Sequence, residues 1–229
     1  MPRRPRICFE NAFYHVFNRG LNKELIFRQK KDYIKFLQCL QDLKAKKKYD
    51  HSIYAYVLMP NHFHLLIQTK KIPIGKIMSS LSTSYAMYFN KTYKRVGMLF
   101  QNRFKSKLCQ KEDYFLGASR YIHLNPIVAG LVNNFEAYPW SSYHELFGTT
   151  SFSIIDKKEV IRLVGETPYE REVYRKFLEE GMLKFKDRDK DRDKELEKEY
   201  LFDDDISGKP SFNSITQKKY IRRKNNRHK

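Results

Sequence analysis

Hydrophobic and polar positions along the first 130 residues switch between two periods, which predicts strands and helices in alternation. Aromatic and β-branched residues fill segment 11–19, which stops at a glycine, as expected of a first strand. Segments 51–59 and 62–69 are also strand-like, and the Pro-Asn pair between them predicts an antiparallel hairpin. Segment 103–110 alternates in strand fashion, with basic residues on one face.

Three further segments repeat apolar residues every three or four positions, which predicts helices over 32–48, 74–94 and 111–124. We expect the third helix to end near Asn125 because Pro126 follows. The order strand, helix, strand, strand, helix, strand, helix is typical of an α+β ferredoxin-like (RRM-like) fold. It predicts an antiparallel sheet with helices packed on one face and the other face open to a ligand.

The composition of the chain changes past about residue 150. Segment 168–185 has the spacing of an amphipathic helix, and the following run KDRDKDRDKELEKEY is almost wholly charged. The last residues, QKKYIRRKNNRHK, form a basic tail suited to electrostatic attachment to nucleic acid. We therefore expect a folded domain over 1–150, a helical, highly charged extension over 151–200 and a basic tail over 201–229.

The charge of the chain points to a polyanionic partner. Its 45 Lys and Arg residues against 26 Asp and Glu give a net charge of +19, which favours nucleic acid. The three cysteines form neither a CxxC pattern nor a disulfide framework, which indicates a reducing compartment. No apolar run approaches the roughly 20 residues of a membrane span, so we expect a cytoplasmic, nucleoid-associated protein with no membrane partner.

The string MPNHFHLLIQ carries the first candidate site. A strand's two-residue period places His62 and His64 on one face, which we expect to be the open one, and Phe63, Leu65 and Ile67 on the face toward the helices. Two imidazoles roughly 6 to 7 Å apart along a strand can share one divalent metal ion. The alternative is an ordinary polar strand face without a ligand.

The third predicted helix carries the second candidate site. Tyr121 and Asn125 are four residues apart, so a phenol and an amide project from the same helix face. Beside the histidine strand, the Asn125 oxygen would complete the metal shell and Tyr121 would attack a phosphate. The alternative is a buried tyrosine followed by an asparagine that caps the helix.

Three separated strings, MPNHFHLLI, RYIHLNPIVAGLV and YPWSSY, together resemble the IS200-like transposases of the Y1 class, in particular their REP-associated tyrosine transposase branch. The resemblance spans about residues 8–147 in the right order and makes 1–150 the catalytic domain. It implies a ferredoxin-like fold, metal ligands at His62, His64 and Asn125, and a catalytic tyrosine at Tyr121. We expect Mg²⁺ or Mn²⁺ as the cofactor.

The resemblance also implies the reaction. Family members cleave single-stranded DNA near a hairpin, keep the 5′ phosphate on the tyrosine, release a 3′ hydroxyl and rejoin strands. We therefore predict a metal-dependent single-strand endonuclease and strand transferase, with single-stranded or hairpin DNA as partner. A monomer has every site residue on one chain, and a homodimer that exchanges the tyrosine helix is the alternative.

Two other functions and one other nucleophile stay open. A sheet with a basic rim and exposed aromatic residues also suits a non-catalytic, single-strand-binding module. A metal-dependent hydrolase would activate water in place of Tyr121. Tyr114 lies seven residues before Tyr121 on nearly the same helix face, but two turns farther from Asn125.

The other histidines are not expected to be metal ligands. We expect His123 to contact phosphate or to pack, and we assign no role to His15, His51 and His144.

Basic residues near the predicted sheet are the candidate DNA-binding groups. Those ahead of the first strand form an arm suited to a groove or a hairpin foot. Others flank the open face of the sheet. The candidates are Arg3, Arg4, Arg6, Arg19, Arg103, Lys105 and Lys107.

Overall fold

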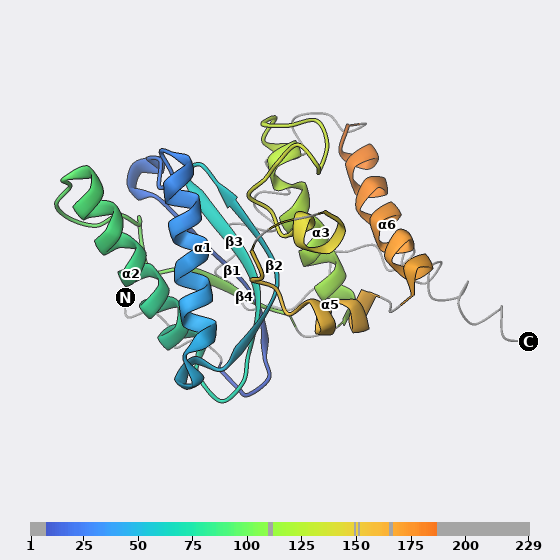
Figure 1. Cartoon of the computed structure of the whole chain (residues 1–229), viewed down its shortest axis with the longest axis horizontal. Coiled ribbons are helices and arrows are strands. Elements are labelled where there is room, and N and C mark those ends of the chain that lie inside the picture. The colour runs from blue at the N-terminus through green and yellow to red at the C-terminus, as the bar shows by residue number, and fades with distance from the viewer. Residues whose placement is uncertain (1–7, 110–111, 149, 151, 165–166, 187–229) are drawn as a thin grey trace, which may run out of the picture. The chain divides into compact units, whose positions relative to one another are not determined.

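The computed structural model describes residues 8–109, 112–148, 150, 152–164 and 167–186. Four strands form one antiparallel sheet in the order β2-β3-β1-β4 (Figure 1). Each overlaps a segment that the sequence predicts to be a strand, and the predicted hairpin coincides with β2 and β3 at both ends. The strands are β1 (Phe13–Arg19), β2 (His51–Met59), β3 (His62–Thr69) and β4 (Lys105–Cys109).

Helices occupy the segments in which apolar residues repeat at helical spacing. α1 starts earlier than predicted because the Asp32 side chain accepts hydrogen bonds from the backbone N–H groups of Arg28 and Gln29. The helices are α1 (Lys30–Ala45), α2 (Ile74–Tyr93), α3 (Glu112–Val128), α4 (Tyr143–Phe147), α5 (Lys157–Val164) and α6 (Pro168–Lys186), with short 3-10 helices η1 (Leu21–Lys23) and η2 (Lys47–Tyr49).

α3 continues past the point at which its sequence predicts an end. The helix contains Pro126 and runs to Val128, so the expected end near Asn125 is wrong. A proline inside a helix removes one main-chain hydrogen bond, and here that loss falls close to the helix end, where it disturbs little. The Ala129 N–H still donates to the Asn125 carbonyl, and Gly130, at a φ of +67°, ends the helix in the left-handed conformation.

The sheet has helices on both faces, so the expectation of helices on one face is wrong for α3. α1 covers one face, where Phe36 packs against Phe63 with ring centroids 4.8 Å apart, and α2 packs on α1. α3 covers the other face, where Phe115 contacts Phe13 and Tyr54 at 5.9 and 5.1 Å (Figure 1). The physical reason is that α3 has its own apolar stripe, which needs a surface to cover it.

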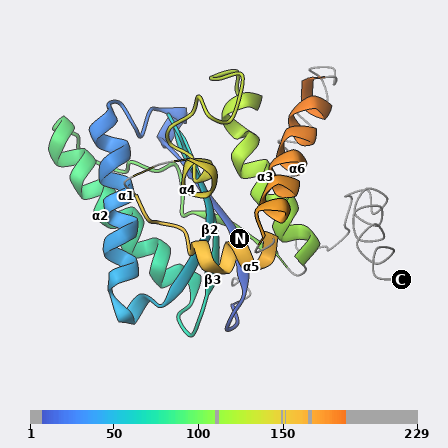
Figure 2. The ribbon, with the colours of Figure 1, turned by 45° about the vertical axis from the view of Figure 1, so that its right-hand side comes forward.

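The free edge of β2 is covered by the segment that contains the YPWSSY string. The Leu58 N–H donates to the Trp140 carbonyl, and the Ser142 N–H donates to the Tyr56 carbonyl. Farther along, the Asp156 carboxylate accepts a hydrogen bond from the Ile53 N–H. α4 and α5 lie beside this edge (Figure 2). Pairing the edge satisfies its backbone groups and protects it from pairing with another chain.

Almost all described residues belong to one compact unit, Met1–Leu183, which includes α5 and most of α6. A second unit, Lys184–Lys229, falls largely outside the described residues, as do the charged run from 187 to 200 and the basic tail over 201–229. None of the described helices has both the length and the hydropathy needed to cross a membrane.

Candidate active site

The two histidines of β3 lie on the face of the sheet that α3 covers. Their ring centroids are 5.1 Å apart. Phe17 of β1 is the cross-strand partner of His64 and stacks on it, with centroids 5.5 Å apart. His64 is fully buried, whereas His62, at the start of the strand, stays partly exposed. The expectation of two imidazoles on an open face is therefore wrong for His64.

α3 brings Tyr121 and Asn125 to these histidines. The Tyr121 ring contacts the His64 ring edge-on, with centroids 5.6 Å apart. The Asn125 side-chain amide donates to the Tyr121 carbonyl at 2.9 Å, and Asn125 lies within hydrogen-bonding reach of His62. All four side chains singled out by the sequence thus come together within one chain.

His15 of β1 belongs to the same cluster, although its sequence position suggests no role. Its Nε2 atom lies 2.9 Å from Nδ1 of His64, and its ring contacts the Tyr121 ring at a centroid distance of 5.6 Å. His15 is fully buried. Strand alternation places it on one face with Phe13 and Phe17, but only the pairing of β1 with β3 reveals its partner.

The histidines of this cluster are neutral at physiological pH. Burial lowers the pKa of His15 to about 3. The pKa of His62 falls to about 4 because of burial and the charge of Arg19, while a hydrogen bond with Asn125 acts in the opposite direction. His64 has a pKa well below its ordinary value because it is buried and lies beside two other imidazoles. Neutral imidazole is the form that binds metal ions.

The arrangement suits a divalent cation. Nδ1 of His62 lies 2.6 Å from the Asn61 side-chain oxygen, and Nδ1 of His64 lies beside His15, so Nε2 is the remaining nitrogen on both rings. Nε2 of His64 is buried and has no hydrogen-bond partner. Two imidazole nitrogens and the Asn125 oxygen form a mixed donor set. Among the described residues, no three His, Cys, Asp or Glu side chains gather into a metal site.

His123 takes no part in this cluster. It is fully buried, and its Nε2 atom lies 2.8 Å from the Ser142 hydroxyl. That hydroxyl in turn accepts from the Tyr56 N–H and donates to the Tyr56 carbonyl. His123 therefore links α3 to the edge of β2, which agrees with packing and not with a phosphate contact. The side chain of Tyr114, the rival nucleophile, lies outside the described residues.

Three of the candidate DNA-binding residues lie beside the histidines. Arg19 is the cross-strand partner of His62, and Lys105 and Lys107 on β4 are the partners of Phe17 and His15. Cross-strand partners project to the same face of a sheet. Arg103 is exposed ahead of β4, and Arg3, Arg4 and Arg6 lie outside the described residues.

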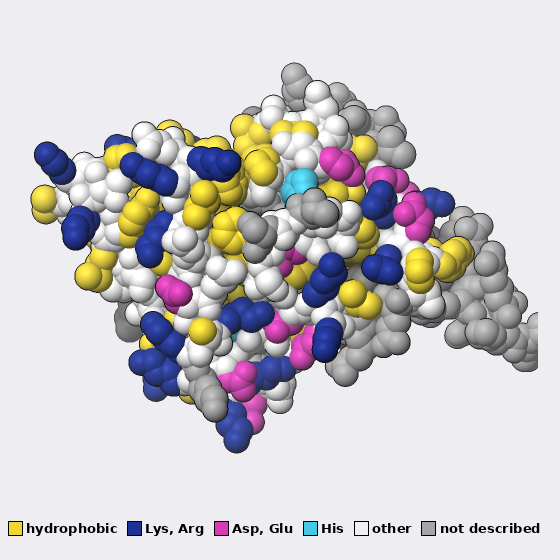
Figure 3. All heavy atoms as spheres, in the orientation of Figure 1, with side chains coloured by type: hydrophobic (Ala, Val, Ile, Leu, Met, Phe, Trp, Pro, Cys, Tyr) yellow, Lys and Arg dark blue, Asp and Glu magenta, His cyan; other side chains and the backbone are white. Residues whose placement is uncertain are grey.

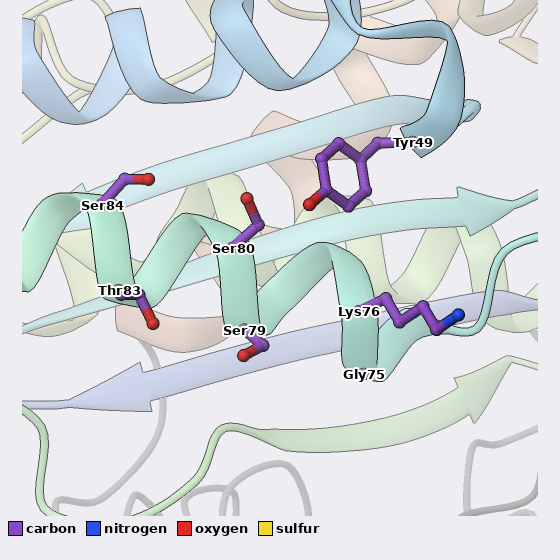
Figure 4. Close-up of a pocket in the computed structure, with 7 residues that line it drawn as sticks. All are labelled: Tyr49, Gly75, Lys76, Ser79, Ser80, Thr83 and Ser84. Atoms are coloured by element: carbon purple, nitrogen blue, oxygen red, sulfur yellow. The ribbon is translucent and has the colours of Figure 1, made fainter.

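Charge and surface shape alone do not locate the site. Lys and Arg side chains are spread over the face seen in Figure 3, with hydrophobic and acidic side chains among them. A shallow groove on α2 is lined by Tyr49 and Lys76 and by the side chains of Ser79, Ser80, Thr83 and Ser84 (Figure 4). It contains none of the clustered histidines, so the candidate site rests on the side chains between β3 and α3.

Residues 8–125, slightly more than half of the chain, match the family described as "Transposase IS200 like". The chain belongs to this family. The matched region contains both histidines of β3 as well as Tyr121 and Asn125, so the family assignment and the geometric cluster concern the same part of the transposase-like domain. No curated protein matches the chain.

A solved structure shares its fold, and a second was compared with it. A REP-associated tyrosine transposase bound to a REP hairpin is similar with a TM-score of 0.55 and 16% sequence identity, over 68% of this chain and 90% of that chain. A putative transposase from Deinococcus radiodurans R1 has a TM-score of 0.38 and 16% identity, over 53% of this chain and 95% of that chain. The first likeness shows a common fold for the sheet and its helices.

Proposed function

We propose that this member of the IS200-like transposase family is a divalent-metal-dependent, single-strand DNA endonuclease and strand transferase that acts at hairpin-containing DNA. Tyr121 is the nucleophile, and His62, His64 and Asn125 are the metal ligands. The observation that carries the proposal is the contact of the Tyr121 ring with His64, beside an imidazole nitrogen that is buried without a partner. We also place the chain in the REP-associated branch and its sheet in the ferredoxin-like class.

In this reaction the Tyr121 phenol oxygen attacks a backbone phosphorus of the DNA. The phenol loses its proton to solvent as a bond forms between its oxygen and phosphorus, the bond from phosphorus to the 3′ oxygen breaks, and the departing oxygen takes up a proton from solvent as a 3′ hydroxyl. The 5′ phosphate stays on the tyrosine. Because one phosphate ester replaces another, attack by a 3′ hydroxyl on the adduct can rejoin strands without an external energy source.

The surrounding residues meet the demands of this step. A phenol has a pKa of about 10, so it needs nearby positive charge to react at neutral pH. Lys105 and Lys107 supply that charge on the same face of the sheet. When bound, a divalent cation polarises the scissile phosphate. His62 and His64 would hold it through Nε2, and Asn125 through its side-chain oxygen, since the amide nitrogen already donates to the Tyr121 carbonyl.

The test is formation of a covalent adduct. The full chain is incubated with a labelled single-stranded DNA hairpin and Mn²⁺ and run on a denaturing gel. We expect a labelled species that migrates above free DNA and is lost in Tyr121→Phe and on chelation with EDTA. Tyr114→Phe is the matched control, because it removes the rival hydroxyl of the same helix and should leave the adduct in place.

Each other outcome selects a different function. Cleavage products without an adduct would indicate a hydrolase that activates water. Hairpin binding that persists in His62→Ala and in EDTA, with no cleavage under Mg²⁺ or Mn²⁺, would indicate a non-catalytic binding module. An adduct that survives Tyr121→Phe and disappears in Tyr114→Phe would move the nucleophile by two helical turns.

A further inference from the structure

The two ligand histidines are each held at Nδ1 by a different kind of partner. Nδ1 of His62 lies 2.6 Å from the side-chain oxygen of Asn61. An amide oxygen only accepts hydrogen bonds, so this nitrogen carries the proton and Nε2 has the free electron pair that a metal needs. Nδ1 of His64 instead lies 2.9 Å from Nε2 of His15, and a neutral imidazole nitrogen can donate or accept.

The His15–His64 pair therefore has two neutral arrangements. In one, Nδ1 of His64 donates to His15, and Nε2 of His64 has a free electron pair directed at the candidate site. In the other, His15 donates, and Nε2 of His64 carries a proton that blocks coordination. Both Nε2 of His64 and Nδ1 of His15 are buried without a hydrogen-bond partner, so the protein's own hydrogen bonds favour neither arrangement.

We propose that His15 is a positioning residue: its Nε2 atom accepts the Nδ1 proton of His64 and so presents Nε2 of His64 to the metal ion. This inference rests on the proposed function, because it assumes that His64 is a ligand. Metal-binding histidines in proteins usually donate their second ring nitrogen to such an acceptor, which fixes both the tautomer and the ring orientation.

The surroundings of His15 suit this role. β1 is an interior strand, paired on both sides, so the backbone that carries His15 is held by two ladders. The ring is fully buried between Phe17, at a centroid distance of 5.6 Å, and Tyr121, at the same distance. In this buried position its Nε2 atom lies 2.9 Å from Nδ1 of His64. Burying a polar ring among aromatic side chains is costly unless it makes a specific contact.

The test measures Mn²⁺ binding to the full chain without DNA, by electron paramagnetic resonance. His15→Phe keeps a ring of similar size but removes the acceptor, and we expect affinity to fall about 10- to 100-fold. His15→Gln places an amide oxygen near the position of Nε2, and we expect it to recover most of that loss. Phe17→Leu is the matched control, since it changes the packing on His64 without changing any polar atom.

A spectroscopic measurement on the unmodified chain does not depend on how the variants fold. With ¹⁵N-labelled histidine and Zn²⁺ as a diamagnetic probe, we expect the His64 proton on Nδ1 and coordination through Nε2. A proton on Nε2, a His15→Phe affinity equal to that of the unmodified chain, or a His15→Gln as weak as His15→Phe would overturn the role of His15. Absence of Mn²⁺ binding in the unmodified chain would instead overturn the proposed function.

Discussion

The two faces of the sheet are built from the same strands but differ in chemistry. On the face toward α1, Phe63 packs on Phe36, and the contact is wholly apolar. On the face toward α3, the buried groups include two imidazoles, His15 and His64, in contact with the phenol of Tyr121. One face therefore buries apolar side chains, as a protein core ordinarily does, and the other also buries polar rings.

This difference indicates that the two faces contribute differently to stability. Burial of apolar side chains supplies most of the stability of a domain, whereas a buried polar atom without a partner costs roughly 1–3 kcal/mol. The face toward α3 carries this cost at Nδ1 of His15 and Nε2 of His64. The first face thus has the composition of a stabilising core, whereas the second contains the candidate site. Substitutions on the two faces should therefore fail in different ways.

The largest effect is expected on the apolar face. Phe63→Ala removes a fully buried ring and leaves a cavity, so the free energy of unfolding should fall by roughly 3–5 kcal/mol. Urea denaturation measures this change. Met87→Ala, at an exposed apolar position of α2, is the control and should change it by less than about 0.5 kcal/mol. A loss below 1 kcal/mol in Phe63→Ala would contradict the assignment of stability to this face.

For a proposed metal ligand on the face toward α3, we expect a loss of metal affinity with little change in stability. His62→Ala should lower Mn²⁺ affinity by about 100-fold or more, since it removes a proposed ligand, and should change the free energy of unfolding by less than about 1 kcal/mol. Gln68→Ala lies on the same strand and the same face and should keep the affinity. Mn²⁺ titration measures the affinity and urea denaturation measures the stability. Equal Mn²⁺ affinity in the two variants would contradict the assignment of metal binding to His62.

Loss of the hydrogen bonds that link α3 to the edge of β2 should have an intermediate effect on stability. Ser142→Ala leaves Nε2 of His123 and the Tyr56 N–H without their partner, so the melting transition should shift by the equivalent of about 1–3 kcal/mol. Ser141→Ala removes only a weaker contact, 3.3 Å from the Tyr143 N–H, and serves as the control. Equal shifts in the two variants would show that the contact of His123 with Ser142 does not hold α3 to the sheet.

The smallest effect is expected at the basic edge. Lys107→Gln on β4 should weaken hairpin binding a few-fold and reduce the salt dependence of log Kd by about one unit, as expected for one phosphate contact. Lys91→Gln, at an exposed position of α2, should leave the slope unchanged. Fluorescence anisotropy between low and physiological salt measures both. A larger change in Lys91→Gln would place the DNA on the α2 side.

Much of the fold follows from periodicity. The predicted hairpin of β2 and β3 is confirmed at both ends, because two apolar, β-branched and aromatic segments flank a short Pro-Asn turn. The predicted helix end near Asn125 is wrong, because a proline close to a helix end costs only one hydrogen bond. Local rules thus gave the elements but not every boundary.

For the candidate site too, local sequence patterns predict some features and the tertiary structure decides others. Strand alternation by itself placed His62 and His64 on one face, and helical spacing placed Tyr121 and Asn125 together, because both depend only on residues nearby in the chain. Only the tertiary structure decided that α3 covers the histidine face and that His15 lies beside His64. No local pattern specifies which strand becomes a neighbour or which sheet face a helix covers, since pairing and packing depend on the whole chain.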